Sequence, residues 1–279
     1  MIIKSFSKLN LSLRIRGKLK NGLHDIQSNI FLTSLYDKIS INKIKNKKDI
    51  IIFTGKFGKN IQKYKNSVAE TLALLRKLKI IKSNSYKIIV DKKIPVFAGL
   101  GGGTSNSAFL MKYFLKKNAS SKIVNIFEKK IGTDFRLFLK KQSYQKNLRK
   151  ILSYKNIFFF HILLVYPNVK CITKIIYSLY RKNKKEQFFQ YQNITSKEKF
   201  LNLLKKDKND LQKIVEKKYQ KIKNILNFIN MQHGCEISRI TGSGSVCFGL
   251  FKSKKTAFDA LCRIKRKFPK YWSIYTKTI

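Results

Sequence analysis

The sequence has few prolines, glycines, cysteines and acidic residues. Its 279 residues include 3 prolines, 13 glycines, 4 cysteines and 14 acidic residues. The cysteines form no C-x-x-C pair, and His233 near Cys235 has no second pair of ligands to complete a zinc site. We therefore expect no protein-bound metal centre, and cysteines that are small buried apolar residues in a reducing compartment.

The sequence also lacks an apolar run long enough to cross a bilayer as a helix. Its longest apolar runs, 157–166 among them, are too short. Residues 1–20 are basic and lack acids, as in a transit peptide. The period-two alternation of residues 8–15 instead favours a strand of the mature protein. We expect a cytoplasmic protein with no membrane partner, either a monomer or a weak homodimer.

Negative charge is scarce, because 61 Lys and Arg stand against the 14 acids and give a net charge of +47. Such a charge attracts nucleotides, nucleic acids and anionic membranes. Nucleic-acid binders usually concentrate this charge on one face or tail. Here lysine recurs along the whole chain, in runs such as 41–48. A diffuse compositional bias is therefore favoured, and a nucleic-acid partner is not expected.

What the sequence does contain is enough apolar material for a large core. Hydrophobic residues make up 43% of the chain and aromatic residues 13%, so we expect one large or two medium domains, divided into 1–152 and 153–279. Periodicity and turn residues predict strands over 5–16, 37–43, 50–54, 86–90, 157–165, 236–240, 246–251 and 271–277. They predict helices over 66–80, 107–117, 121–131, 173–182 and 254–268, and helical segments over much of 196–231.

The most informative motif is a glycine-rich segment between a predicted strand and a predicted helix. Four of the five residues at 99–103 are glycine, which lets the backbone approach a ligand and turn several N–H groups toward it. The following helix start favours phosphate. The segment is neither a P-loop nor a G-x-G-x-x-G fingerprint, and the H-R-D and D-F-G motifs of protein kinases are absent. We expect a phosphate-binding loop made of Pro95, Val96, Phe97, Ala98, Gly99, Leu100, Gly101, Gly102, Gly103, Thr104 and Ser105.

Two charged residues stand beside apolar runs and need a reason to be there. Asp134 precedes the apolar residues Phe135, Leu137 and Phe138, and Lys8 lies in the alternating first strand. Each alone is more often part of a structural ion pair or a solvated group. Together with the glycine loop they become candidates for acid–base and electrostatic roles.

Several short motifs occur in the order found in the GHMP kinase superfamily, which includes galactokinase, homoserine kinase, mevalonate kinase and phosphomevalonate kinase. More narrowly they resemble the bacterial diphosphocytidyl-methylerythritol kinases. The segments that carry the resemblance are Ser7–Leu11, Gly22–Asp25, Leu35–Asp37, Asn66–Val68, Pro95–Asn106, Ile131–Asp134, Asn209–Leu211 and Thr241–Ser245, of which Pro95–Asn106 is the most specific.

This resemblance implies an α+β, two-domain GHMP-kinase-like architecture with the active site in the cleft between domains. It implies ATP and Mg²⁺ as cofactors and phosphorylation of a hydroxyl of a cytidine-diphosphate-bearing substrate in non-mevalonate isoprenoid synthesis. Lys8 and Asp134 take the catalytic roles, and residues 95–105 cradle ATP. Four residues are expected to face the substrate: Asn10, His24, Gly242 and Ser243.

The chain departs from the family pattern at three places. Phe135-Arg136 stands where the family usually has Val-Pro, Leu23 stands where it has Tyr, and no glycine occurs between Gly132 and Gly234. Two alternatives therefore stay open. One is another GHMP small-molecule kinase, and the other is a nucleotide- or nucleic-acid-binding protein on a degenerate kinase scaffold. Taken without the resemblance, the glycine turn Gly242–Ser245 is more typical of a hairpin.

Overall fold

A computed structural model of the chain describes residues 1–20, 22–59, 61–62, 65–116, 119–181, 191 and 194–279. Its contacts form two compact units: the first contains 1–8, 35–96 and 101–140, and the second 9–34, 97–100 and 141–279. The units interleave because strands β1 (Ile2–Asn10) and β3 (His24–Ile44) contribute residues to both. The contiguous division at residue 152 stays a prediction.

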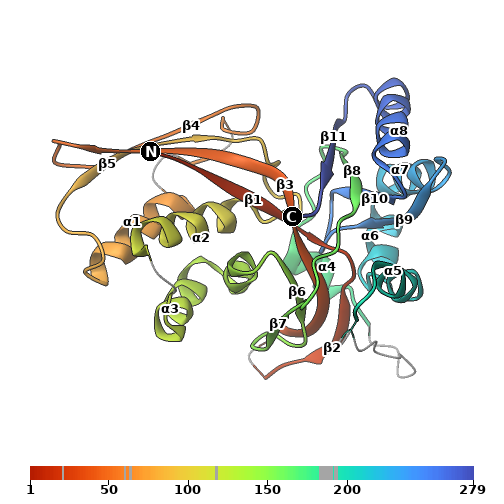
Figure 1. Cartoon of the computed structure of the whole chain (residues 1–279), viewed down its shortest axis with the longest axis horizontal. Helices are drawn as coiled ribbons and strands as arrows, with labels where there is room; N and C mark the ends of the chain where they lie inside the picture. The colour runs from red at the N-terminus through yellow and green to blue at the C-terminus, as the bar shows by residue number, and fades with distance from the viewer. Residues whose placement is uncertain (21, 60, 63–64, 117–118, 182–190, 192–193) are drawn as a thin grey trace. The chain divides into compact units, whose positions relative to one another are not determined.

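The sheet of the first unit is built from isoleucine-rich strands. Residues Lys38–Ile44 of β3 pair antiparallel with β5 (Ser85–Asp91), which pairs in parallel with β4 (Ile50–Thr54). Alternate residues such as Ile39 and Ile41 are buried, as expected for strands with one face on the core. The helices of the first unit lie together beside this sheet (Figure 1).

Three α-helices and a 3₁₀ helix complete the first unit: α1 (Ser67–Lys77), α2 (Gly102–Leu115), α3 (Ser121–Ile131) and η1 (Thr133–Leu139). Asn66 caps α1, since its side-chain oxygen accepts hydrogen bonds from Val68 N and Ala69 N at 3.1 and 3.0 Å. Helix α2 begins five residues before the position expected from the sequence, so it includes two glycines of the loop. The expected end of that helix, Lys117, lies outside the described residues.

The second unit contains a four-stranded antiparallel sheet in the order β11-β8-β10-β9. Its strands are β8 (His161–Tyr166), β9 (Cys235–Ile240), β10 (Cys247–Phe251) and β11 (Trp272–Lys277). Helices α7 (Gln220–Asn230) and α8 (Lys254–Lys267) pack on it (Figure 1). The helical spacing of Ile222, Ile225 and Ile229 buries one face of α7 in the core.

The remaining elements of the second unit are β2 (Arg14–Lys18), β6 (Gln142–Gln145), β7 (Ile151–Ser153), α4 (Thr173–Ser178), α5 (Lys197–Lys206) and α6 (Gln212–Lys218). The helical segments expected over much of 196–231 are the three helices α5, α6 and α7. Strand β8 begins four residues later than expected because the backbone before it bonds to side chains: Phe158 N donates to Gln142 Oε1 and Phe160 N to Thr278 Oγ1, both at 2.9 Å. Lys182, the expected end of α4, is not among the described residues.

Two expectations from composition can be compared with the structure. Cys171 and Cys247 are buried as expected, but Cys262 is exposed, because it lies on a face of α8 that points away from the sheet. Within the part of the chain that the structure describes, no helix has the length and apolarity to span a membrane.

Candidate active site

The glycine-rich segment forms a turn that leads directly into α2. Gly99 and Gly101 have φ angles of +82° and +67°, a region that residues with a side chain rarely adopt. Gly101 is the N-terminal cap of α2 and forms no side-chain capping bond. The first N–H groups of a helix have no partner within the helix. The start of α2 is therefore a natural binding element for phosphate oxygens.

Close packing also requires glycine at these positions. A Cβ atom added to Gly101 would lie 2.7 Å from Phe138 Cζ and 3.3 Å from Lys8 Cγ. A Cβ added to Gly99 would lie 2.6 Å from the carbonyl oxygen of Thr241. Residues 97–100 belong to the second unit and Gly101 to the first, so each glycine meets residues of its own unit.

The two hydroxyl residues at the end of the loop differ in their surroundings. Ser105 is fully buried; its hydroxyl donates to the carbonyl oxygen of Phe6 at 2.6 Å and lies 2.7 Å from Ser5 Oγ. Its backbone N–H donates to Gly101 O at 2.9 Å. Thr104 is half-buried. The Ser105 side chain thus holds α2 against β1, while Thr104 and the preceding amides lie at the helix start.

Lys8 and Asp134 meet within the first unit. Lys8 Nζ lies 3.4 Å from Asp134 Oδ2; the lysine side chain is 6% exposed and the aspartate side chain 42%. Lys8 also lies against Gly101, so the pair is next to the start of α2. The expected proximity is confirmed. A buried ammonium beside a carboxylate that reaches solvent is an arrangement that can receive a proton and stabilise negative charge.

In the second unit the Thr241–Ser245 turn brings several predicted residues together. Asn10 N donates to Thr241 Oγ1 at 2.9 Å, and Asn10 Nδ2 donates to Ser28 Oγ at 2.8 Å. Ser243 Oγ lies 3.0 Å from Thr173 Oγ1, at the start of α4. Because the Gly99 backbone packs on the same turn, Asn10, Ser243 and the first part of the glycine loop are neighbours.

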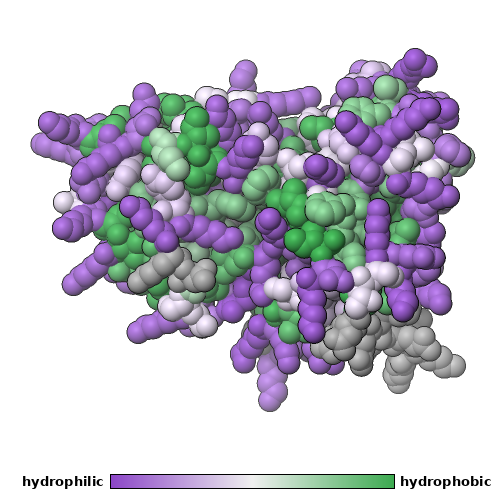
Figure 2. Space-filling view, viewed as in Figure 1, coloured by the Kyte–Doolittle hydropathy of each residue, from purple (hydrophilic) through white to green (hydrophobic). Residues whose placement is uncertain are grey.

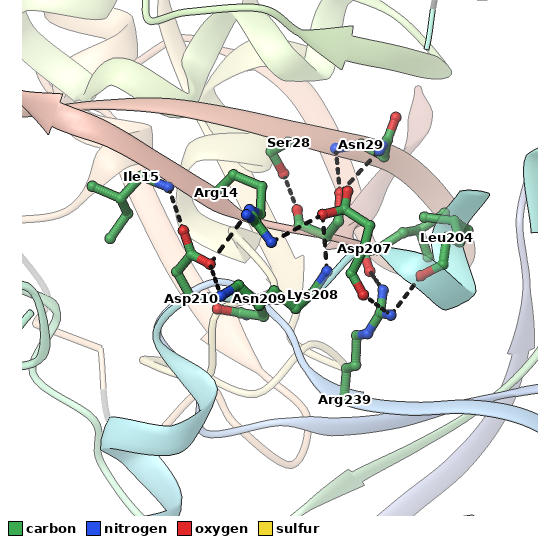
Figure 3. Close-up of polar contacts among 12 residues, drawn as sticks. Arg14, Ile15, Ser28, Asn29, Leu204, Asp207, Lys208, Asn209, Asp210 and Arg239 are labelled. Atoms are coloured by element: carbon green, nitrogen blue, oxygen red, sulfur yellow. Dashed lines mark hydrogen bonds and ion pairs between the residues drawn. The ribbon is translucent and has the colours of Figure 1, made fainter. Parts of the chain in front are cut away.

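A buried ionic cluster around Arg14, Asp207 and Arg239 (Figure 3) is connected to this turn through Asn209. Asn209 Nδ2 donates to the carbonyl oxygens of Ile240 and Gly242 at 3.0 and 2.8 Å. Two aspartates close to Asn209 in the sequence pair with Arg14, whose Nη1 lies 3.7 Å from Asp207 Oδ1 and whose Nε lies 3.4 Å from Asp210 Oδ1.

Arg239 adds a second guanidinium to the cluster and donates to backbone carbonyl oxygens, including Leu11 O at 3.0 Å. Burial lowers the pKa of Arg239, and the Asp207 carboxylate opposes that effect. The turn therefore rests on a fully buried polar support, which fixes its position.

His24 lies at the start of β3, half-buried rather than in an open loop. Its ring centroid lies 5.0 Å from that of Tyr177 on α4, with a tilt of 40° between the rings. Burial lowers the pKa of His24, and the nearby Lys18 ammonium lowers it further. A neutral imidazole next to a phenol ring forms an aromatic surface, although Leu23, where the family has Tyr, is 44% exposed and has no ring.

Comparison with known proteins decides the family. The chain is 38% identical to the 4-diphosphocytidyl-2-C-methyl-D-erythritol kinase of Pelagibacter ubique (strain HTCC1062), over 99% of this chain and 98% of that protein. The chain belongs to the 4-diphosphocytidyl-2-C-methyl-D-erythritol kinase family. The family member from Buchnera aphidicola subsp. Schizaphis graminum (strain Sg) is 31% identical over 90% of this chain and 85% of its own length.

Two further kinds of comparison concern a domain of the chain and its fold. The model of the GHMP kinases C terminal family matches residues 187–270. A crystal structure of 4-(cytidine 5'-diphospho)-2C-methyl-D-erythritol kinase covers 100% of both chains with a TM-score of 0.73 at 19% identity. A mevalonate kinase structure covers 100% of this chain and 99% of its own with a TM-score of 0.71 at 17% identity. The expected α+β, GHMP-kinase-like fold is confirmed. As a family member the chain is a small-molecule kinase, and ATP is its phosphate donor.

Reasoning from the sequence did not identify three residues that surround the candidate site. Tyr177 and Thr173 contact His24 and Ser243, but they are far from them in the sequence and no spacing links them. Lys92, 1% exposed, donates to Asp37 and, at 3.0 Å, to Asn106 Oδ1 on α2. The one available signal was a lysine next to the predicted strand that leads into the glycine loop.

Proposed function

We propose that the chain transfers the γ-phosphate of ATP to a hydroxyl of 4-diphosphocytidyl-2-C-methyl-D-erythritol, a step in isoprenoid precursor synthesis. The observation that carries the proposal is the Lys8–Asp134 pair next to the start of α2, in a chain that belongs to this kinase family over nearly its whole length. The pair supplies a base and a cation beside a phosphate-binding helix start.

The proposed chemistry is a single displacement at phosphorus. The acceptor oxygen forms a bond to the γ-phosphorus as the bond from that phosphorus to the β,γ-bridging oxygen of ATP breaks. The hydroxyl proton passes to the Asp134 carboxylate, and the Lys8 ammonium stabilises the charge on the transferring group. Positioning and electrostatic stabilisation dominate such reactions.

The phosphates of ATP are placed at the backbone N–H groups of Gly102, Gly103 and Thr104, at the positive end of α2. Magnesium is part of the proposal as an ion bound with ATP. Among the described residues, no group of three or more His, Cys, Asp or Glu side chains is arranged to hold a metal. Magnesium is typically held by one or two carboxylates together with substrate phosphates. Bound there, it would neutralise phosphate charge.

The cytidine-bearing part of the substrate is placed in the second unit. The His24 and Tyr177 rings offer an aromatic surface for a base, and burial, which lowers the pKa of His24, favours its neutral ring. Asn10, Gly242 and Ser243 cluster around the turn at Gly99. The substrate assignment therefore uses residues that are already fixed by the fold.

The test is an ADP-release assay with ATP, magnesium and a panel of alcohols. We expect turnover of 4-diphosphocytidyl-2-C-methyl-D-erythritol, with little or none of mevalonate, homoserine or galactose. Turnover of another alcohol in place of the cytidyl compound would keep the kinase and reject the substrate. ATP binding without turnover of any alcohol would reject the proposed reaction and favour a degenerate kinase.

A further inference from the structure

The candidate base Asp134 is carried by a short element with a glycine at its start. Helix α3 ends at Ile131 and is capped by Gly132, whose φ of +134° is one that only glycine adopts readily, and η1 follows at once. A Cβ atom added at Gly132 would meet nothing within 4 Å. No side chain packs against Gly132 at that position, so the contacts that η1 makes with α3 determine how η1 leaves the helix.

Arg136, two residues after Asp134, provides such a contact. Its Nε donates to Glu128 Oε1 at 2.9 Å and its Nη2 to Glu128 Oε2 at 2.6 Å, which is a two-pronged fork. The same Nη2 donates to Asn125 Oδ1 at 2.7 Å. Glu128 also accepts, through its backbone oxygen, the Gly132 N–H at 3.0 Å. The fork therefore connects η1 to the last turn of α3, on the other side of Gly132.

The rest of η1 is fixed by packing that does not involve this fork. The Phe135 ring stacks on Phe127 of α3 with centroids 5.1 Å apart. Lys112 Nζ donates to the carbonyl oxygen of Phe138 at 2.8 Å, and the Phe138 ring lies against Gly101. These contacts hold the element in the core, and within the turn itself Phe135 N donates to Gly132 O at 3.1 Å.

We propose that the Arg136–Glu128 fork is a positioning device that holds the Asp134 carboxylate next to Lys8, where the proposed base must lie. The inference rests on the proposed role of Asp134 as the base. Arg136 is a positioning residue: it touches neither Lys8 nor Asp134 in any contact described here, and it acts through the backbone of η1.

The fork affects the placement of the Asp134 carboxylate more than it affects the stability of the fold. Arg136 is 25% exposed and Glu128 18%, and a partly exposed ion pair contributes little to the free energy of unfolding. A planar guanidinium that donates to both carboxylate oxygens fixes the relative orientation of the two side chains, which a lysine ammonium cannot do. An error of about 1 Å in the placement of a reacting group can cost about 10²-fold in rate. The fork is thus suited to controlling kcat while hardly affecting folding.

The experiment compares Arg136→Gln and Arg136→Lys in single-turnover and steady-state assays, with Lys129→Gln as the control that removes a neighbouring exposed charge on α3. Both Arg136 variants should lower kcat by about tenfold or more, with the KM for ATP unchanged and Tm within about 3 °C of the parent. The control should match the parent. Glu128→Gln should resemble Arg136→Gln, and the double variant should be no worse than either single variant.

The decisive comparison repeats Arg136→Gln in an Asp134→Asn background. If the fork acts by placing Asp134, Arg136→Gln lowers kcat in the parent and does not lower the residual rate of Asp134→Asn further. Full activity of Arg136→Lys, or an equal loss in both backgrounds, would overturn the inference and leave Asp134 as the base. Full activity of Asp134→Asn itself would instead overturn the proposed base, and this inference with it.

Discussion

At the scale of the residue, the protonation of His24 depends on its surroundings, which include Lys18 and Tyr177. His24 pairs with Lys18 across the β2–β3 ladder and lies against the Tyr177 ring. Burial is the larger cause of its lowered pKa and the Lys18 charge the smaller. The protonated form is therefore disfavoured in the folded chain relative to the unfolded one, in which a histidine titrates near about 6.5.

We predict that an NMR titration places the pKa of His24 below that reference value, and that Lys18→Gln moves it part of the way back. Linkage gives the sign for stability. Because the unfolded chain binds the proton more readily, the contribution of His24 is complete above the unfolded pKa and is lost as the pH falls through the folded pKa. A His24 pKa at or above the reference value would contradict the assignment of a neutral ring.

At the scale of elements, the start of helix α2 depends on a glycine at position 101. Gly101 has a positive φ and no room for a Cβ atom beside Phe138. We predict that Gly101→Ala destabilises the fold by about 1–3 kcal/mol and raises the KM for ATP, because the start of α2 must shift. Chemical denaturation and steady-state kinetics measure the two effects.

Gly17→Ala is the matched control, since a Cβ atom at Gly17 in β2 would meet nothing within 4 Å and Gly17 has no positive φ. It should change neither stability nor the KM for ATP measurably. Equal behaviour of the two alanine variants would show that the constraint on Gly101 is absent.

The support behind the Gly242 turn gives a second prediction for an element. Asn209, 4% exposed, bonds two carbonyl oxygens of that turn and of the strand before it. We predict that Asn209→Ala costs about 1–3 kcal/mol, since buried acceptors lose their donor, and raises the KM for the alcohol substrate more than that for ATP.

The control for Asn209 is Asn224→Ala on the exposed face of α7, where the side chain bonds only to Gln220 among its described contacts. It should behave as the parent. An Asn209→Ala enzyme with an unchanged KM for both substrates would show that the turn does not depend on this support.

The sequence predicted individual helices and strands better than the connections between them. Residues 121–131 and 50–54 form the helix and the strand expected at those bounds, because periodicity and β-branched content are local signals. The start of α2 was missed, since a run of glycines carries no helix signal, and its position depends on packing against Lys8 and Phe138.

In the candidate site, too, some contacts were predictable from the sequence and others were not. The meeting of Lys8 and Asp134 was predictable from motif order, whereas Tyr177 beside His24 and the Arg136–Glu128 fork depend on tertiary packing. Arg136 was visible in the sequence only as a departure from the family pattern. Its contact with Glu128 needed the bend at Gly132.

At the scale of the whole chain, exposed positive charge occurs in both units of the described residues. Exposed lysines lie in both units, for example Lys48 in the first and Lys223 in the second, and hydrophilic residues cover most of the face shown in Figure 2. A net charge of +47 nevertheless raises the local concentration of anionic substrates.

We predict that raising the ionic strength from about 0.05 to 0.3 M increases the KM for ATP several-fold and changes kcat little, because salt screens long-range attraction. Sucrose at matched osmolality controls for effects that are not electrostatic. A KM that stays constant over this range would show that the charge plays no part in substrate capture.

The most direct test of the account is phosphoryl transfer by Asp134→Asn, which keeps the shape of the side chain and removes its charge. With 4-diphosphocytidyl-2-C-methyl-D-erythritol and ATP in a single-turnover assay, we predict a rate lower by about 10²-fold or more, with ATP affinity and Tm close to the parent. A well-folded Asp134→Asn protein that transfers phosphate at the parent rate would contradict the claim that this carboxylate, held against Lys8, acts as the base.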